Sequence, residues 1–159
     1  MPITLRVAEP GDVSTILRFI EGLAEYEKLS DRCVATEQSL RATLFGERPY
    51  AEVILASLDG LDAGFALFFH NYSTFLAKPG IYLEDLFVDP AFRGKGLGKA
   101  LLQQLAKLAV GRGCGRLEWS VLDWNQPAID FYKSVGAEPL DEWTIYRVAG
   151  AALTRLASI

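Results

Sequence analysis

Apolar residues recur along the chain with two periods, and each period predicts a type of element. Spacings of three and four residues predict helices over residues 13–24 and 97–109, each with one apolar stripe. A shorter helix carries Leu40 and Leu44, with Thr36 as its N-cap. Runs of β-branched, aromatic and aliphatic residues predict strands over residues 3–7, 53–57, 63–69, 81–88, 116–122 and 143–148.

The connecting segments complete a mixed α/β alternation. Asp59-Gly60 is a turn signal between two of the strands, and residues 71–80 are expected to form a loop. Residues 125–133 form a short helix, with Pro127 suited to its first turn. The 159 residues contain no internal repeat or linker, so we predict one domain over residues 1–159.

Composition excludes several classes of protein. The chain is 50% hydrophobic and 23% charged, values typical of a globular protein rather than a disordered one. No apolar run approaches the roughly 20 residues of a membrane helix, and the N-terminus lacks a secretory pattern. Two cysteines favour a reducing, cytoplasmic location. With only one histidine beside them, no metal site is expected. No membrane partner is expected either, because no apolar run is long enough to span a bilayer.

The charge is unevenly distributed along the chain. The net charge of −4 argues against a nucleic-acid partner. Residues 93–133 nevertheless carry a net charge of +4, and the rest of the chain carries −8. One region therefore suits an anionic ligand, while the remainder suits a cationic one. The alternative is uneven surface charge without a ligand.

A glycine-rich segment, residues 93–99, follows a predicted strand and opens a predicted helix. Its backbone N–H groups and the helix N-terminus together favour a phosphate group. A P-loop is excluded because Ala100 replaces its Ser or Thr, and a dinucleotide motif because Lys99 replaces its third glycine. The acetyl-CoA pattern [QR]-x-x-G-x-[GA] is satisfied by Arg93, Gly96 and Gly98. A plain glycine-rich turn is the alternative.

Two longer blocks contain this segment and the short helix. Residues 83–98 read Leu-Glu-Asp-Leu-Phe-Val-Asp-Pro-Ala-Phe-Arg-Gly-Lys-Gly-Leu-Gly, and residues 124–137 read Trp-Asn-Gln-Pro-Ala-Ile-Asp-Phe-Tyr-Lys-Ser-Val-Gly-Ala. In order and spacing they resemble the GNAT superfamily of acetyl-CoA-dependent N-acetyltransferases. Residues 23–27 and 45–50 extend the similarity to its spermidine/spermine (diamine) branch. The resemblance implies the GNAT α/β fold, a mixed, mostly antiparallel sheet flanked by helices.

The resemblance also implies that acetyl-CoA is the co-substrate. It would lie between the strand ending at Val88 and the strand beginning at Arg116, with backbone N–H groups holding the thioester. The residues implied to bind acetyl-CoA are Leu86, Phe87, Val88, Arg93, Gly94, Lys95, Gly96, Leu97, Gly98, Lys99, Asn125, Gln126, Pro127 and Ala128.

Two residues are the candidates for proton transfer. Tyr132 matches the proton donor of the family, and a phenol is protonated at neutral pH. Glu84 is the candidate base, directly or through a water, because a carboxyl inside an apolar strand is expected to be desolvated. Alternation along the strand would place Asp85 on the opposite face. The alternatives are a packing role for Tyr132 and solvated or paired acids at both strand positions.

For the amine, the resemblance implies Tyr26, Glu27, Glu84 and an acid before the last strand, Glu142 or Asp141. Glu27 could equally be a solvated helix residue. Trp119 and Trp124 line an amine channel or belong to the core.

Covalent catalysis is disfavoured. Cys33 and Cys114 lie in no nucleophile motif, and His70 is on another segment, where a structural role is expected. The sequence therefore predicts direct attack of an amine in a ternary complex.

The predicted function is transfer of an acetyl group to a small cationic amine, a polyamine or a thialysine-like compound. The turn at Asp59-Gly60 and the segment between Pro139 and Trp143 are shorter than in animal polyamine acetyltransferases. The identity of the amine therefore stays open. The alternatives are acetylation of a peptide amine and a non-catalytic acyl-CoA sensor. The family implies a homodimer.

Overall fold

The computed structural model describes residues 2–159, which group into two compact units, one ending at residue 120 and the other covering residues 121–159. The prediction of a single domain stays a prediction. The elements of the first unit are β1 Ile3–Val7, η1 Pro10–Asp12, α1 Val13–Tyr26, η2 Ser30–Arg32, α2 Glu37–Leu44, β2 Glu52–Leu58, β3 Leu61–Ser73, β4 Lys78–Val88, η3 Pro90–Phe92, α3 Leu97–Gly111 and β5 Leu117–Trp119.

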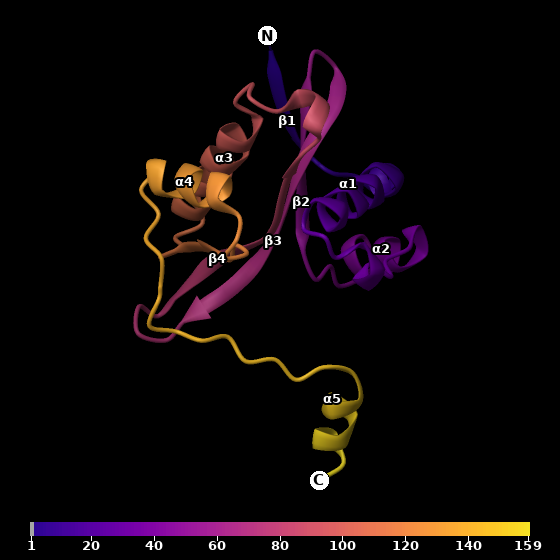
Figure 1. The fold of residues 1–159 in the computed structure, drawn as a ribbon, viewed down its shortest axis with the longest axis vertical. Coiled ribbons are helices and arrows are strands. Elements are labelled where there is room, and N and C mark those ends of the chain that lie inside the picture. The colour runs from indigo at the N-terminus through magenta and orange to yellow at the C-terminus, as the bar shows by residue number, and fades with distance from the viewer. Residues whose placement is uncertain (1) are drawn as a thin grey trace. The chain divides into compact units, whose positions relative to one another are not determined.

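The strands described in the first unit form one mixed sheet in the order β1-β2-β3-β4-β5 (Figure 1). Neighbouring pairs are antiparallel except β4 and β5, which run parallel. The tight turn at Asp59-Gly60 joins β2 to β3 as predicted, and both residues have positive φ. The predicted fold, a mostly antiparallel sheet with flanking helices, is confirmed.

Helices α1 and α2 lie on one face of the sheet (Figure 1). The apolar stripe of α1 buries Val13, Ile16 and Phe19 against the sheet. Phe19 stacks on Phe65 of β3 and contacts Phe87 of β4 at a centroid distance of 6.0 Å. Burial of these large side chains is the main source of stability on this face.

The polar residues before these two helices play different roles. Thr36 caps α2 as predicted, since its side chain accepts a hydrogen bond from the Ser39 N–H at 3.1 Å. Asp12 stands before α1, but its carboxylate binds the Arg6 guanidinium at 2.7 and 2.8 Å and accepts the Glu9 N–H. That ion pair holds the pKa of Asp12 below its usual value.

Helix α3 lies on the other face of the sheet (Figure 1). Its stripe of Leu97, Leu101, Leu102, Leu105 and Ala109 is buried, as the spacing predicts. On the sheet, Phe68, Ile81 and Leu83 are buried, and none of them belongs to the core cluster that contains the α1 residues. The sheet is therefore covered on both faces, which explains its near-continuous apolar strands.

The hairpin of β3 and β4 is longer than predicted. Residues 71–80 do not form a loop, because Asn71 to Ser73 pair with Gly80 to Lys78. Only residues 74–77 connect the strands, and Ala77 there has positive φ. The predicted strand over 116–122 is shorter, since the ladder between β4 and β5 ends at Leu83 and Trp119.

The second unit contains α4 Gln126–Ser134 and α5 Gly150–Ala157. The predicted short helix is confirmed as α4. The prediction of a last strand over residues 143–148 is wrong: the segment has the composition of a strand, but no ladder joins it to another strand in residues 2–159. A strand forms only where its backbone groups pair with a neighbouring strand, and the composition of a segment does not specify that neighbour. Helix α5 was not predicted.

Strands β3 and β4 approach each other closely at Gly64. A Cβ on Gly64 would collide with the Phe87 carbonyl oxygen and lie 3.2 Å from Val88 Cα, both backbone atoms. Gly64→Ala is therefore expected to lower the free energy of unfolding by about 1–3 kcal/mol in urea denaturation. Gly111→Ala is the matched control, because a Cβ there meets nothing within 4 Å. Equal unfolding free energies for the two variants would contradict the packing argument.

Candidate active site

The glycine-rich loop joins η3 to α3. Gly94 and Gly96 have φ of +77° and +88°, and Gly96 is the N-cap of α3. Such φ values strain any residue with a Cβ, so the glycines fix the loop conformation. The exposed backbone and the exposed Lys95 and Lys99 at a helix N-terminus suit phosphate oxygens. Leu97, by contrast, is buried in the core, so only its backbone is available to a ligand.

Arg93, predicted to bind acetyl-CoA, has its side chain directed to the end of α1. Its Nε donates a hydrogen bond to the Val88 carbonyl at 3.0 Å. Its Cζ lies 4.8 Å from the ring centroid of Tyr26 and 5.7 Å from that of Phe87. The guanidinium therefore stacks over aromatic rings of α1 and β4.

Strand β4 contains a bulge at Glu84. Leu67 of β3 pairs with Asp85, but the next residue, Phe68, pairs with Leu83, so Glu84 has no partner in the ladder. The pairing with β5 also ends at Leu83. In residues 2–159 the segment from Glu84 to Val88 thus has a strand neighbour on the β3 side only. Its other edge, which includes Leu86 and Phe87, offers backbone groups to a ligand.

The bulge changes which carboxyl is buried. Glu84, expected to be desolvated, is exposed, and Asp85 is half-buried on the face that carries Leu67 and Phe87. Burial, reinforced by the charges of Glu84 and Glu27, raises the pKa of Asp85 to about 7. The expectation of a desolvated Glu84 was wrong because simple alternation ignores the extra residue of a bulge.

The end of α1 carries the two residues implied to bind the amine. Tyr26 is its last residue, and Glu27 follows as the C-cap. Glu27 is half-buried, and burial together with the charge of Glu84 raises its pKa. Glu27, Glu84 and Asp85 therefore interact electrostatically, which concentrates negative charge at this end of the sheet.

The second unit carries the other predicted residues on α4. Asn125 is its buried N-cap, and the Asn125 side chain accepts a hydrogen bond from the Ala128 N–H at 3.4 Å. Pro127 stands in the first turn as predicted, and Gln126 binds the Asp130 carboxylate at 2.7 Å. The half-buried Tyr132 contacts the ring of Phe131 at a centroid distance of 5.7 Å.

The remaining predicted amine residues lie outside regular structure or in β5. Asp141 and Glu142 are exposed in a turn, and no strand follows them in the described part of the chain. Trp119 is half-buried in β5, and Trp124 is exposed just before α4.

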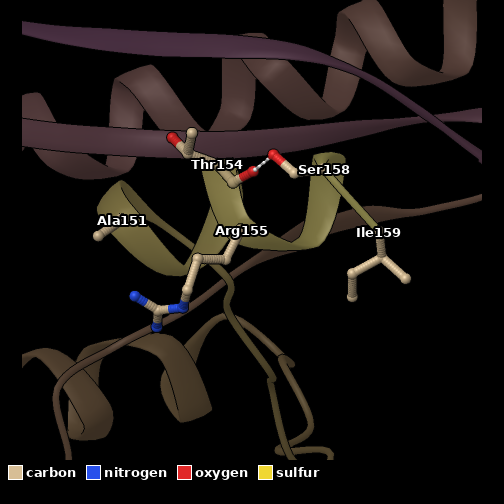
Figure 2. Close-up of a pocket in the computed structure, with 5 residues that line it drawn as sticks. All are labelled: Ala151, Thr154, Arg155, Ser158 and Ile159. Carbon is tan, nitrogen blue, oxygen red and sulfur yellow. Dashed lines mark hydrogen bonds between the residues drawn. The ribbon is translucent and has the colours of Figure 1, made fainter.

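A hollow lies along one side of α5 (Figure 2). Its lining comes from that helix and the two residues after it: Ala151, Thr154, Arg155, Ser158 and Ile159. None of the predicted site residues lines it, and none of its lining residues is Asp or Glu. The hollow therefore does not mark the site of the reaction.

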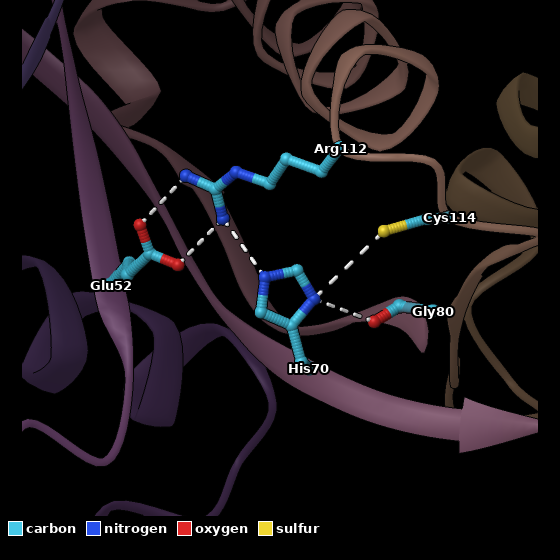
Figure 3. Close-up of polar contacts among 5 residues, drawn as sticks. All are labelled: Glu52, His70, Gly80, Arg112 and Cys114. Atoms are coloured by element: carbon cyan, nitrogen blue, oxygen red, sulfur yellow. Dashed lines mark hydrogen bonds and ion pairs between the residues drawn. The ribbon is translucent and has the colours of Figure 1, made fainter. Parts of the chain in front are cut away.

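His70 and Cys114 belong to a polar network (Figure 3). Arg112 pairs with Glu52 at 2.8 and 3.0 Å and donates to His70 Nε2 at 3.0 Å. His70 is then the neutral tautomer with its proton on Nδ1, which donates to the Gly80 carbonyl at 3.0 Å. The Cys114 sulfur lies 3.9 Å from the same Nδ1. Because Nδ1 is protonated, it is no base for the thiol, and the network ties β2, β3 and β4 to the end of α3.

Residues 2–159 contain neither a metal-binding cluster nor a membrane helix. No group of three or more His, Cys, Asp or Glu side chains there could hold a metal ion. No helix in that range is long and apolar enough to cross a membrane.

Comparison with known proteins decides the family. Residues 20–137 match the model of the Acetyltransferase (GNAT) family. This chain belongs to that family. The predicted resemblance is thereby confirmed, as is the prediction of an N-acetyltransferase, and the GNAT family uses acetyl-CoA as its co-substrate.

Similar proteins cover nearly the whole GNAT chain. A thialysine N-epsilon-acetyltransferase of Bos taurus is 40% identical, over 98% of this chain and 97% of its own. An L-ornithine N5-acetyltransferase of Arabidopsis thaliana is 37% identical, over 94% and 85% respectively. A solved integron cassette protein of V. cholerae superposes with a TM-score of 0.84 and 31% identity, covering 100% of this chain and 99% of that one.

Proposed function

We propose that this protein transfers the acetyl group of acetyl-CoA to a primary amine of a small cationic substrate, by direct attack in a ternary complex. The observation that carries the proposal is the arrangement along β4. This strand bears the acidic pair Glu84 and Asp85 at its bulge, then an edge without a strand neighbour, and it leads into the glycine-rich loop at α3. The acidic pair suits an amine, the strand edge suits a thioester, and the glycine-rich loop suits a phosphate.

The thioester and the phosphates interact with backbone groups in this proposal. The N–H groups of Leu86, Phe87 and Val88 hold the thioester oxygen as it becomes an oxyanion, since main-chain donors are already oriented. The glycine-rich loop, with Lys95 and Lys99, holds the phosphates. The backbone of residues 125–128, at the start of α4, contacts the coenzyme.

Proton transfer requires one base and one acid. Glu84 accepts a proton from the substrate ammonium, directly or through a water, and the free amine then attacks; the exposure of Glu84 at the bulge leaves it accessible. The amine nitrogen bonds to the carbonyl carbon, and the carbon–sulfur bond breaks as the tetrahedral intermediate collapses. Tyr132 donates its phenolic proton to the departing thiolate, and the second proton lost by the nitrogen as it becomes the amide restores the phenol. No enzyme-bound acetyl intermediate forms.

The amine is proposed to be short and cationic. Glu27, Glu84 and Asp85 concentrate negative charge at the end of α1, and Glu142 is proposed as a further contact. The names of the two similar enzymes specify thialysine and ornithine, each an amino acid with a side-chain amine. We therefore propose a side-chain amine of this size. Polyamines are the second substrate class, because a spermidine/spermine N(1)-acetyltransferase-like protein of Homo sapiens is 33% identical over 90% of this chain, a match that spans 22% of that protein.

The test is thiol release from acetyl-CoA with a panel of amines: thialysine, ornithine, lysine, putrescine, spermidine, spermine and a basic peptide. Turnover with thialysine or ornithine is expected to exceed that with polyamines, and both to exceed that with the peptide. Preferred turnover of the peptide would move the assignment to a protein substrate. Tight binding of acetyl-CoA without turnover of any amine would indicate an acyl-CoA sensor.

The assembly and location are part of the same proposal. A homodimer in the cytoplasm is the expectation for this family, and Cys33 and Cys114 are both free thiols. Light scattering coupled to gel filtration would give a mass of twice 17.5 kDa for the dimer. A mass of one chain at micromolar concentration would contradict it.

A further inference from the structure

The position of Arg93 differs from that of a phosphate-binding side chain. Arg93 directly precedes the glycine-rich loop, but its guanidinium reaches back five residues to the Val88 carbonyl. From there it lies over Tyr26, the last residue of α1, and Phe87, next to the end of β4. Its side chain therefore links the strand that leads to the phosphate loop with the helix end that carries the amine residues.

Two features make this arrangement specific for arginine, and a third depends on its charge alone. The Nε–H is a donor that lysine lacks, and it fixes the guanidinium plane through Val88. A planar, weakly hydrated guanidinium stacks on aromatic faces better than an ammonium does. Its positive charge also lies at the C-terminal end of α1, where the helix dipole favours a cation.

The contact bears on Glu27 as well. Helix ends fray, and α1 ends at Tyr26 with Lys28 in a left-handed conformation just beyond. A side chain that holds Tyr26 against β4 therefore also holds the adjacent Glu27 near that strand. The charge of Glu84 on β4 contributes to the raised pKa of Glu27. Removing the contact would take away one of the interactions that hold the helix end on β4.

We propose that Arg93 is a positioning residue of the amine site: it holds Tyr26 and Glu27 at the end of β4 and sets the affinity for the amine. The exposed Lys95 and Lys99 then supply the cationic side chains for the phosphates. This inference rests on the proposed function, because it needs Tyr26 and Glu27 to contact the amine.

The test separates the two substrates kinetically. Arg93→Lys keeps the charge and removes the Nε–H and the planar stacking, so the KM for the amine is expected to rise about fivefold, the size of one exposed cation–π contact. The KM and the calorimetric Kd for acetyl-CoA should stay within about twofold. Lys95→Met is the matched control, for which the acetyl-CoA constants should rise and the amine KM should not.

A double-mutant cycle checks that Arg93 acts through the ring. In a Tyr26→Leu background, Arg93→Lys is expected to change the amine KM by less than about twofold, since the stacking partner is already gone. A Tyr26→Phe background keeps the ring and should preserve the fivefold effect. Equal effects of Arg93→Lys in the wild-type and Tyr26→Leu backgrounds would remove Tyr26 from the inference.

Two failures are distinguishable. A rise in the acetyl-CoA KM on Arg93→Lys, with an unchanged amine KM, would make Arg93 a phosphate ligand and overturn this inference alone. Absence of turnover by the wild-type protein with every amine would overturn the proposed function and the inference with it. Thermal unfolding of each variant shows whether a kinetic change follows from loss of folded protein.

Discussion

Replacing Tyr132 by Phe is expected to lower kcat by about 10²- to 10³-fold and to leave the KM values for both substrates within about threefold. The substitution deletes one oxygen and keeps the ring that contacts Phe131. Without the phenolic proton, the thiolate must leave unprotonated or take a proton from water, and both raise the barrier to C–S cleavage. Steady-state thiol release with saturating amine and acetyl-CoA measures the change.

Tyr146→Phe is the matched control for this prediction. Tyr146 is 91% exposed and belongs to the same unit of the chain, so the identical chemical change there should leave kcat unaltered. Loss of the proton donor impairs departure of the thiolate and not deprotonation of the amine. Weakly basic amines, of which a larger fraction is already unprotonated, should therefore lose as much rate as strongly basic ones. An unchanged kcat for Tyr132→Phe would assign Tyr132 to packing, the alternative that the sequence left open.

Much of the fold follows from local patterns in the sequence. The apolar stripes of α1 and α3 give their faces, Thr36 gives the start of α2, and Asp59-Gly60 gives a turn. These features depend on neighbouring residues, so a single sequence contains the information. The glycine-rich loop is predictable for the same reason, because positive φ at Gly94 and Gly96 requires glycine.

Other features depend on pairing between distant segments. The bulge at Glu84 arises from the register between β3 and β4, which the composition of β4 does not reveal. Consequently the sequence predicted the wrong buried carboxyl. The Arg93 side chain is a similar case, since its ring partners Tyr26 and Phe87 lie on other elements. Residues 143–148 show the converse: they have a strand pattern without a partner strand in the described chain.

Asp85→Asn is expected to remove most of the pH dependence of stability between about pH 4 and pH 7. In the folded protein the pKa of Asp85 is about 7, whereas its ordinary value is 3.8. Across that interval the folded state keeps a proton that the unfolded chain has released. The free energy of unfolding of the wild-type protein therefore falls as the pH rises from about 4 towards 7, and above pH 7 this decrease is complete.

The size of the effect follows from the two pKa values. Their difference corresponds to at most about 4 kcal/mol, and partial exposure of Asp85 reduces the expected loss to about 2 kcal/mol. Asparagine is neutral at every pH, so above pH 7 the variant should be more stable than the wild type by about that amount. Urea denaturation at pH 5, 6, 7 and 8 measures both curves. Asp31→Asn, at an exposed position, is the control and should follow the wild-type curve.

The same titration should appear in the kinetics. Above pH 7 Asp85 adds a negative charge to a face that already carries Glu27, so kcat/KM for a cationic amine is expected to rise through about pH 7 in the wild type. In Asp85→Asn that inflection should disappear, although any inflection from the amine itself stays. Parallel profiles for the two proteins, together with identical pH dependence of unfolding, would show that Asp85 is ionised throughout. Loss of the unfolding dependence alone would place Asp85 in the scaffold of the sheet rather than in the recognition of the amine.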